Sequence, residues 1–207
     1  MAENKLGPFE PTFKSGDVQF TSAGTPSRFE LLEFWRWSAS DLLDNTTRGV
    51  LAEYLVAKAL NIAIRQPRES WSSWDLTWIV PNGATIKVEV KSAAYLQSWG
   101  QKDHSKIQFV VPKRRGFDSV NNRFDATPKR HTDLYVFALL NHKAKATVDP
   151  TNRDQWCFWV LPTSKLDART RSQHSIGLRA LQDLAGEAVH FEHLRGAAIE
   201  ALFSTSQ

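Results

Sequence analysis

The chain has 207 residues, a length that suits one domain of moderate size or a domain with an arm. Hydrophobic residues make up 42% and charged residues 23%, which excludes the low-hydrophobicity composition of disordered chains. A formal net charge of +4 favours an anionic partner, and the single cysteine, Cys157, excludes an internal disulfide and a cysteine-based zinc cluster. Cys157 lies within the apolar run WCFWVL and is expected in the core.

Residues 1–27 are rich in Pro, Gly, Ser and Thr and show no sustained periodicity, so we expect an arm that is mobile or draped over the domain. Residues 28–207 are expected to form a single domain. The first residues lack the basic start and apolar stretch of a secretory signal, and no apolar run approaches the ~18 residues that span a bilayer. We therefore expect no membrane partner and a cytoplasmic location.

Two helices are predicted next. Apolar spacing predicts the first over about residues 29–43, and Asp44, Asn45 and Thr46 are capping candidates for the second, over about 47–62. Glu53 lies in the second helix, where its neighbours three and four positions away are all apolar or glycine. An acid on a largely buried helix needs a more distant partner, such as a metal ion or its water, and the alternative is a capping or backbone contact.

A β-hairpin is predicted from the segment WDLTWIVPNGATIKVEVKS, residues 74–92. Period-two alternation places Val88 and Val90 on one face and Glu89 and Lys91 on the other. The loop Pro-Asn-Gly fits a type I turn followed by a left-handed residue, and closure with this three-residue loop sets Asp75 opposite Glu89. A two-residue Asn-Gly loop would instead place the two carboxylates on opposite faces, but Pro81 has no N–H for a ladder and favours the longer loop.

Carboxylates that face each other across two strands repel unless a positive group lies between them. Lys91 is one such group and a divalent cation is another, because magnesium needs only one or two carboxylates together with water and phosphate. We expect such an ion to be held by Asp75, Glu89 and the Val90 carbonyl, with Lys91 beside a metal-bound water aimed at a phosphodiester. Glu53 is then expected at a second metal position or at an outer-shell water of the first ion. This equipment suits hydrolysis of a phosphate bond.

The rest of the chain is predicted to contain a segment at about 106–112, a basic loop at 113–131, buried strands at 133–140 and 156–161, and a mostly helical tail. The fold class expected from this order is α/β or α+β, with helices packed around one mixed sheet. The candidate substrate-binding residues are Gln97, Gln108, Lys113, Arg114, Arg115, Lys129 and Arg130. Solvated loop surface is the alternative for the basic clusters. His104 and His131 are weaker candidates for proton transfer, and Trp71, Trp74 and Trp99 for stacking on an unpaired base.

The helix with Glu53, the strand with Asp75 and the following Glu89-Val90-Lys91 resemble the PD-(D/E)XK nucleases, also called the restriction endonuclease-like fold. The resemblance spans roughly residues 46–166, with Trp74 where the name of the motif has proline. It implies a mixed sheet flanked by helices and a nuclease that cuts DNA, or less often RNA, with Mg²⁺ or Mn²⁺. In that case Asp75 and Glu89 are the metal-binding acids, Lys91 orients or activates the attacking water, and Glu53 is the added helix glutamate.

Three functions compete at this level. The leading one is a magnesium-dependent DNA nuclease of the restriction or repair type, for which a homodimer would supply two sites for the two strands of a duplex. The second is a nucleic-acid-binding protein that keeps the nuclease fold without cutting. The third is an interaction protein in which the charged cluster is an internal salt-bridge network, so that loss of Asp75 would lower stability and not activity.

Overall fold

The computed structural model describes residues 10–70, 72–118, 123–171 and 173–203. Contacts divide the chain into two compact units, residues 1–40 with 63–70, and residues 41–62 with 71–207. The expected division into an arm of residues 1–27 and a domain of residues 28–207 stays a prediction, and residues 1–9 of that arm lie outside the described residues.

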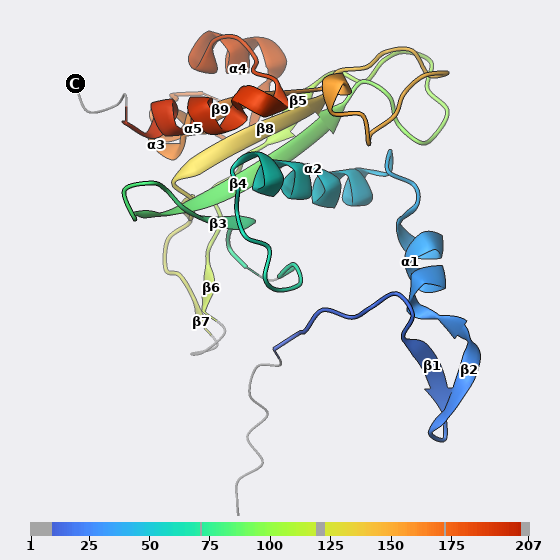
Figure 1. Cartoon of the computed structure of the whole chain (residues 1–207). Helices are drawn as coiled ribbons and strands as arrows, with labels where there is room; N and C mark the ends of the chain where they lie inside the picture. Colours follow the sequence, from blue (N-terminus) through green and yellow to red (C-terminus); the bar gives the residue numbers. More distant parts are fainter. Residues whose placement is uncertain (1–9, 71, 119–122, 172, 204–207) are drawn as a thin grey trace, which may run out of the picture. The chain divides into compact units, whose positions relative to one another are not determined.

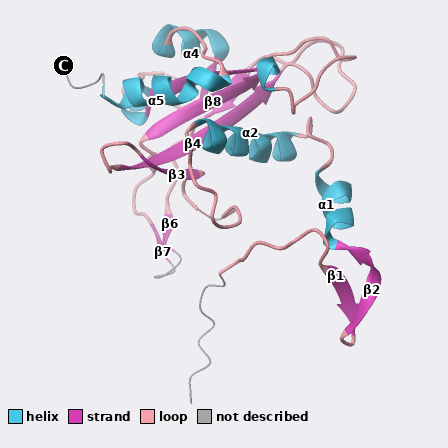
Figure 2. Cartoon of the chain, viewed as in Figure 1, coloured by secondary structure: helices cyan, strands magenta, loops and turns pink. Residues whose placement is uncertain are grey.

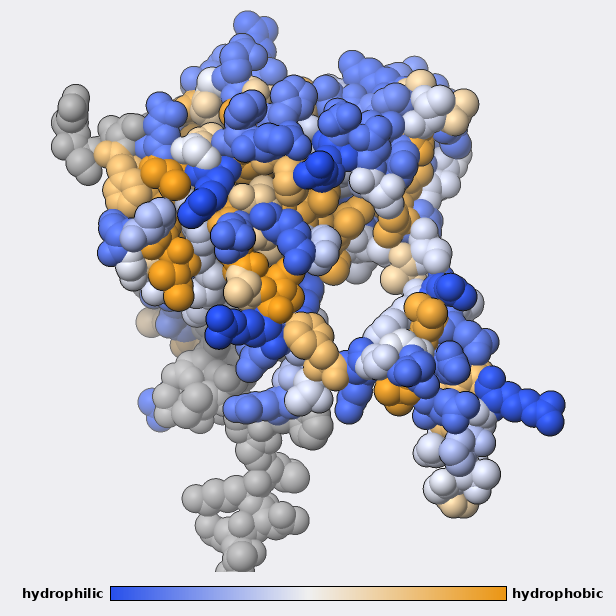
Figure 3. Space-filling model, in the orientation of Figure 1, coloured by the Kyte–Doolittle hydropathy of each residue, from blue (hydrophilic) through white to orange (hydrophobic). Residues whose placement is uncertain are grey.

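The first unit contains a β-hairpin followed by a helix. Strands β1 (Gln19–Ser22) and β2 (Thr25–Glu30) are antiparallel, and the turn between them contains Ala23 and Gly24, both with positive φ. The helix α1 (Leu31–Ala39) matches the expected first helix, and the Glu30 N–H donates to Glu33 Oε1 at its start (3.1 Å). The hairpin was not predicted. No residue of α1 is buried, and Figure 3 shows hydrophobic side chains at the surface of this unit.

The second unit is built on a mixed four-stranded sheet with strand order β3-β4-β8-β9 (Figure 1). These strands are β3 (Leu76–Ile79), β4 (Thr85–Ala94), β8 (Leu134–Leu140) and β9 (Trp156–Pro162). Strand β4 pairs with β8 in parallel, whereas the β3–β4 and β8–β9 pairs are antiparallel. The predicted mixed sheet is therefore confirmed, and the two predicted buried strands correspond to β8 and β9.

Helices and small sheets surround the central sheet (Figure 2). The helices are α2 (Asn45–Ala59), α3 (Thr163–Asp167), α4 (Leu178–Ala185) and α5 (Leu194–Phe203), with 3₁₀ turns at Arg153–Gln155 and Phe191–His193. The two small sheets pair β5 (Gln108–Val110) with β10 (Ser175–Gly177) and β6 (Phe117–Asp118) with β7 (Arg123–Phe124). Both β6 and β7 fall in the segment that was predicted to be a basic loop. Among the described residues, no helix is long and apolar enough to cross a membrane.

The sheet has two different faces. The α2 face carries Val88 and Val90 from β4 and packs in one core cluster with side chains of α2 and α5. The opposite face, here called the pocket face, carries Glu89, Lys91 and Ala93 from the same strand. Its apolar residues belong to a second cluster, which includes residues of β5, α3, β10 and α4.

Local sequence signals explain the start of α2. The carboxylate of Asp44 accepts hydrogen bonds from the N–H groups of Thr46 (2.9 Å) and Thr47 (3.1 Å), which helix geometry leaves without partners. These contacts lower the pKa of Asp44, chiefly through the Thr47 N–H. The capping role predicted for this segment is confirmed at Asp44.

Candidate active site

The turn between β3 and β4 sets the register of the candidate acids. The Gly83 N–H donates to the Val80 carbonyl (2.8 Å), the Val80 N–H donates to the Ala84 carbonyl (2.9 Å), and Gly83 has a φ of 86°. This positive φ is the left-handed conformation that glycine tolerates best. The predicted three-residue loop is confirmed, and Val80 pairs with Ala84 as expected.

Asp75 lies just outside the regular ladder, whose last pair is Leu76 with Val88. Its N–H donates to the Val88 carbonyl (3.1 Å), and its Oδ2 accepts from the Val90 N–H (2.7 Å). The side chain of Asp75 thus takes the place of a strand carbonyl and ties the end of β3 to β4. This contact fixes the carboxylate beside the strand that carries Glu89 and Lys91.

Glu89 and Lys91 form an ion pair between Oε1 and Nζ on the pocket face of β4. Their side chains are 18% and 23% exposed, respectively, so both are largely removed from water. Burial raises the pKa of Glu89, the charge of Lys91 opposes this rise, and the negative charge of Asp75 adds to it. The contribution of Asp75 means that the two carboxylates are close enough to repel each other.

Tyr135 is the neighbour of Glu89 on the adjacent strand, since the two residues pair in the parallel β4–β8 register. Its side chain is buried and stacks on Phe137, with ring centroids 5.9 Å apart. Burial and the charge of Glu89 both raise the pKa of Tyr135, so its phenol stays protonated and able to donate at neutral pH. Sequence reasoning missed this residue because nothing in a buried strand marks one side chain as facing a site.

A pocket opens on the pocket face above Glu89 and Lys91. Its walls bring together residues far apart in the chain: Ser73, Glu89, Lys91, Val111, Pro112, Arg114, Lys129, Arg130, His131 and Tyr135. The structure therefore places two predicted catalytic residues in one hollow with three of the predicted substrate-binding residues. An acid, a lysine and a cationic wall are chemically suited to a phosphate ester.

The other two predicted acids do not line this pocket. Asp75 contacts the backbone of β4 beside it, and Glu53 is buried on α2, the helix that packs against the α2 face of the sheet. Within the described part of the chain, no three His, Cys, Asp or Glu side chains are grouped so that they could hold a metal ion. The predicted metal ligands Asp75, Glu89, Val90 and Glu53 stay a prediction.

The donor chemistry of the site nevertheless fits a hard divalent cation. Mg²⁺ is bound in proteins through one or two carboxylates, with water and substrate phosphate completing its coordination. Asp75 and Glu89 supply two carboxylates whose mutual repulsion contributes to the raised pKa of Glu89. A cation between them would relieve that repulsion, so these two residues are the ones that would hold it.

The basic wall contains cations that are exposed to water and one that is buried. The backbones of Arg114 and Lys129 form a β-bridge with N···O distances of 2.9 and 3.0 Å. Lys129 Nζ lies 3.3 Å from Asp125 Oδ2, Lys113 Nζ lies 3.5 Å from Asp167 Oδ1, and Arg115 is exposed.

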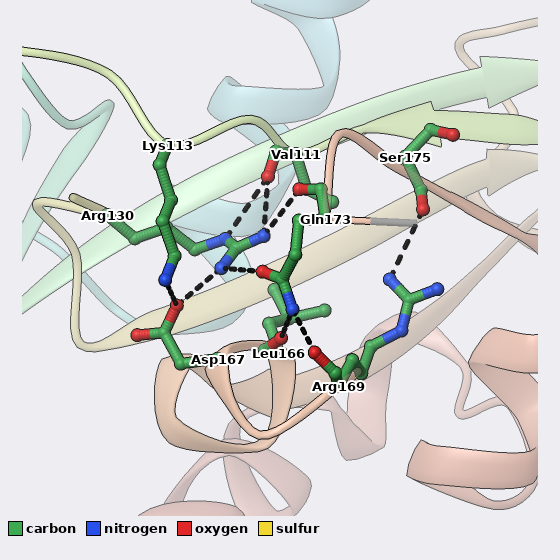
Figure 4. Close-up of polar contacts among 8 residues, drawn as sticks. All are labelled: Val111, Lys113, Arg130, Leu166, Asp167, Arg169, Gln173 and Ser175. Atoms are coloured by element: carbon green, nitrogen blue, oxygen red, sulfur yellow. Dashed lines mark hydrogen bonds and ion pairs between the residues drawn. The ribbon is translucent and has the colours of Figure 1, made fainter. Parts of the chain in front are cut away.

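Arg130 differs from these cations because its side chain is fully buried (Figure 4). It donates to the Val111 carbonyl, the Gln173 carbonyl, Gln173 Oε1 and Asp167 Oδ1. These contacts occupy all five N–H donors of the guanidinium, so none is left for a phosphate. The contacts thus give Arg130 a structural role and not the phosphate-binding role that was predicted for it.

His131 lines the pocket and contacts the backbone of Arg114. Its Nε2 lies 2.9 Å from the Arg114 carbonyl, and because a carbonyl only accepts, Nε2 carries the proton. Its ring lies where a Cβ on Gly116 would be, only 2.6 Å from His131 Cε1. The absence of a side chain at Gly116 is what lets the ring pack there.

Both predicted glutamines have structural partners. Gln97 is buried, donates to the Ala94 carbonyl (3.1 Å) and accepts from Arg48 Nη1 (3.2 Å), and Gln108 donates to Ser175 Oγ (2.6 Å). Neither lines the pocket. Arg48, which sequence reasoning did not single out, is buried and also bonds Ser92 Oγ, Asn45 Oδ1 and the Leu43 carbonyl.

The remaining candidates are spread over the surface. His104 contacts the Lys143 carbonyl (3.0 Å), and Trp99 is half exposed. Trp74 donates to Thr77 Oγ1 (3.0 Å), and Lys87 Nζ lies 4.1 Å from its ring centre, which is a cation–π contact. Trp71 lies outside the described residues.

No protein-family model matches the chain, and no curated protein sequence matches it. Among solved structures, the chain is similar to the bacterial homing endonuclease I-Ssp6803I, with 17% sequence identity and a TM-score of 0.39. The similarity covers 78% of this chain and 93% of the other. This similarity is too low to indicate a function.

Proposed function

We propose that the protein is a metal-dependent nuclease of the PD-(D/E)XK type that hydrolyses phosphodiester bonds of DNA. The observation that supports this function is the pocket in which Glu89 and Lys91 lie with Arg114 and Lys129. The hairpin register adds Asp75 beside the same strand. A purely structural ion pair would not need a hollow or a second set of cations around it.

Each residue has a role that follows from its position. Asp75 and Glu89 would hold Mg²⁺, which would supply a Lewis acid to stabilise the charge on the phosphate. Lys91 stands two residues from Glu89 on the same face, where its ammonium orients the attacking water. For Glu53, which is buried on α2, the role of a supporting acid comes from the resemblance to PD-(D/E)XK nucleases and not from its position.

The cationic wall accounts for the choice of substrate. Arg114 and Lys129 contact backbone phosphates, which gives affinity without reading bases. DNA is the expected substrate, and RNA is the alternative substrate. Two copies of the chain are expected on a duplex when both strands are cut.

The test is to incubate the purified protein with plasmid, branched DNA, single strands and RNA, each with Mg²⁺, with Mn²⁺ and with EDTA. The expected result is cleavage of DNA with either metal and loss of all cleavage in EDTA. Cleavage that persists in EDTA would contradict the metal requirement. Absence of cleavage on every substrate would contradict the nuclease function.

One observation favours the non-cleaving alternative. Lys91 is already paired with Glu89, and Asp75 is already bonded to the Val90 N–H, so these charges have partners within the chain. A nucleic-acid-binding protein that keeps the fold would bind DNA equally well in EDTA and after Lys91→Ala. Binding without cleavage in the same assays would favour this alternative.

A further inference from the structure

The basic wall of the pocket comes from Arg114 and from Lys129, Arg130 and His131, which lie on two segments that pair with each other. Arg114 bridges Lys129, and the Asp125 N–H donates to the Gly116 carbonyl (2.8 Å). Further out, β6 pairs with β7, and the two strands extend away from the central sheet (Figure 1). We call residues 113–118 and 123–131 the ribbon.

Arg130 connects the ribbon to three other parts of the second unit. Val111 follows β5, Asp167 ends α3, and Gln173 precedes β10 (Figure 4). The bonds to the two backbone carbonyls are 2.7 to 3.1 Å long, and Gln173 Oε1 accepts at 3.0 Å. The loop with Gln173 is itself closed by a bond from Gln173 Nε2 to the Arg169 carbonyl. The guanidinium therefore has one fixed position.

A fixed Arg130 also fixes the cations of the pocket. Lys129 and His131 are its chain neighbours, and the bridge to Lys129 carries the constraint on to Arg114. The bridge joins Arg114 and Lys129 to each other, and the bonds of Arg130 join this pair to the segments that carry Val111, Asp167 and Gln173. An apolar side chain at this position would leave the Val111 and Gln173 carbonyls without these donors, so the arginine is what joins the three segments.

We propose that Arg130 is a positioning residue that holds the ribbon so that Arg114 and Lys129 together contact the phosphate backbone of a DNA duplex beside the pocket. This inference rests on the proposed function for its choice of substrate. Arg130 does not itself touch DNA. Its buried guanidinium acts by determining how many DNA phosphates Arg114 and Lys129 neutralise.

The number of neutralised phosphates is measurable through salt. The logarithm of the binding constant falls with the logarithm of the salt concentration, with a slope of about −0.9 per neutralised phosphate. Loss of the contacts of Arg114 and Lys129 would therefore make the slope shallower by about 1.8. A loss of global stability lowers the amount of folded protein and leaves this slope unchanged.

The experiment measures the anisotropy of a fluorescein-labelled DNA duplex of about 25 base pairs, in EDTA, between about 50 and 200 mM salt, conditions chosen from the steep salt dependence of such binding. Arg130→Lys keeps the charge but supplies three donors in place of five. The expected result is weaker binding and a slope shallower by about 1.8, close to that of the double variant Arg114→Ala/Lys129→Ala. Arg48→Lys is the matched control, because Arg48 is also buried and multiply bonded but lies outside the pocket lining.

Asp167→Asn keeps the hypothesis testable if Arg130→Lys does not fold, since Asp167 is 43% exposed and the substitution is isosteric. The expected result is a change of slope in the same direction but smaller. An unchanged slope in both variants, or an equal change in Arg48→Lys, would overturn the positioning role. If the wild-type protein binds the duplex with this pattern yet never cuts DNA with metal, the nuclease function fails and the role of Arg130 stands.

Discussion

The two faces of strand β4 differ in what they contribute. On the α2 face, Val88 and Val90 are buried in a continuous apolar cluster. On the pocket face, Glu89 and Lys91 are placed where burial raises the pKa of the acid. Alternate residues of one strand thus serve stability and chemistry separately. Substitutions on the α2 face are expected to lower stability, and substitutions on the pocket face are expected to lower the cleavage rate.

The largest effect on activity is expected from Asp75→Asn. Asparagine still offers Oδ1 to the Val90 N–H, so the hairpin should keep its register while the negative charge is lost. We expect a fall in the cleavage rate of 10² to 10⁴-fold, on the order of what a lost catalytic charge costs. The check is the rate of plasmid nicking with Mg²⁺, beside circular dichroism to monitor the fold. If the variant is less stable but its folded fraction cuts at the wild-type rate, the role of Asp75 is structural and not catalytic.

The largest effect on stability is expected from the α2 face, with Leu134→Ala. Leu134 is fully buried and pairs with Val88, so its loss leaves a cavity in the cluster below α2. The free energy of unfolding should fall by about 2 to 5 kcal/mol, measured by urea denaturation. The cleavage rate per folded molecule should be unchanged. A large loss of activity in fully folded protein would contradict the separation of the two faces.

A smaller and pH-dependent effect is expected from Glu89→Gln. Because the folded state raises the pKa of Glu89 above its ordinary value of 4.5, the folded state binds this proton more tightly than the unfolded state does. Wild-type stability from this group is therefore highest below pH about 4.5 and is lost as the pH rises through the raised pKa. The neutral variant lacks this loss, so its stability relative to wild type should rise from acid to neutral pH.

The measurement is a series of urea denaturations of both proteins between pH 4 and 8, a range set by where the group titrates. A relative stability that falls with rising pH would mean that the acid is stabilised as a carboxylate by its surroundings.

Much of the fold was predictable because its signals are local. The turn Pro81-Asn82-Gly83 determined the hairpin loop, Asp44 capped α2, and the unbroken apolar runs became β8 and β9. The hairpin of β1 and β2 gave no comparable signal, because its strand residues lack a clean apolar alternation.

The candidate site was predicted in part. Strand periodicity predicts that Glu89 and Lys91 share one face of β4, and in the structure both line a pocket with Arg114 and Lys129. The burial of Arg130 was not predictable, since in sequence it is one cation of three in Lys129-Arg130-His131 and its acceptors near residues 111, 167 and 173 are distant in the chain. The bond from Val90 to the Asp75 carboxylate was also missed, because the register alone does not show where a ladder ends.

Lys91 is the residue on which the proposed catalysis depends most, and the most direct measurement compares Lys91→Ala with Lys87→Ala. Both lysines lie on the pocket face of β4, but Lys87 stacks on Trp74 and does not line the pocket. In metal-dependent DNA cleavage, Lys91→Ala should lose at least 10²-fold in rate and Lys87→Ala should stay within a few-fold of wild type, as expected for a catalytic and a non-catalytic lysine. Equal activity of the two variants, or undiminished cleavage by Lys91→Ala, would contradict the proposed active site.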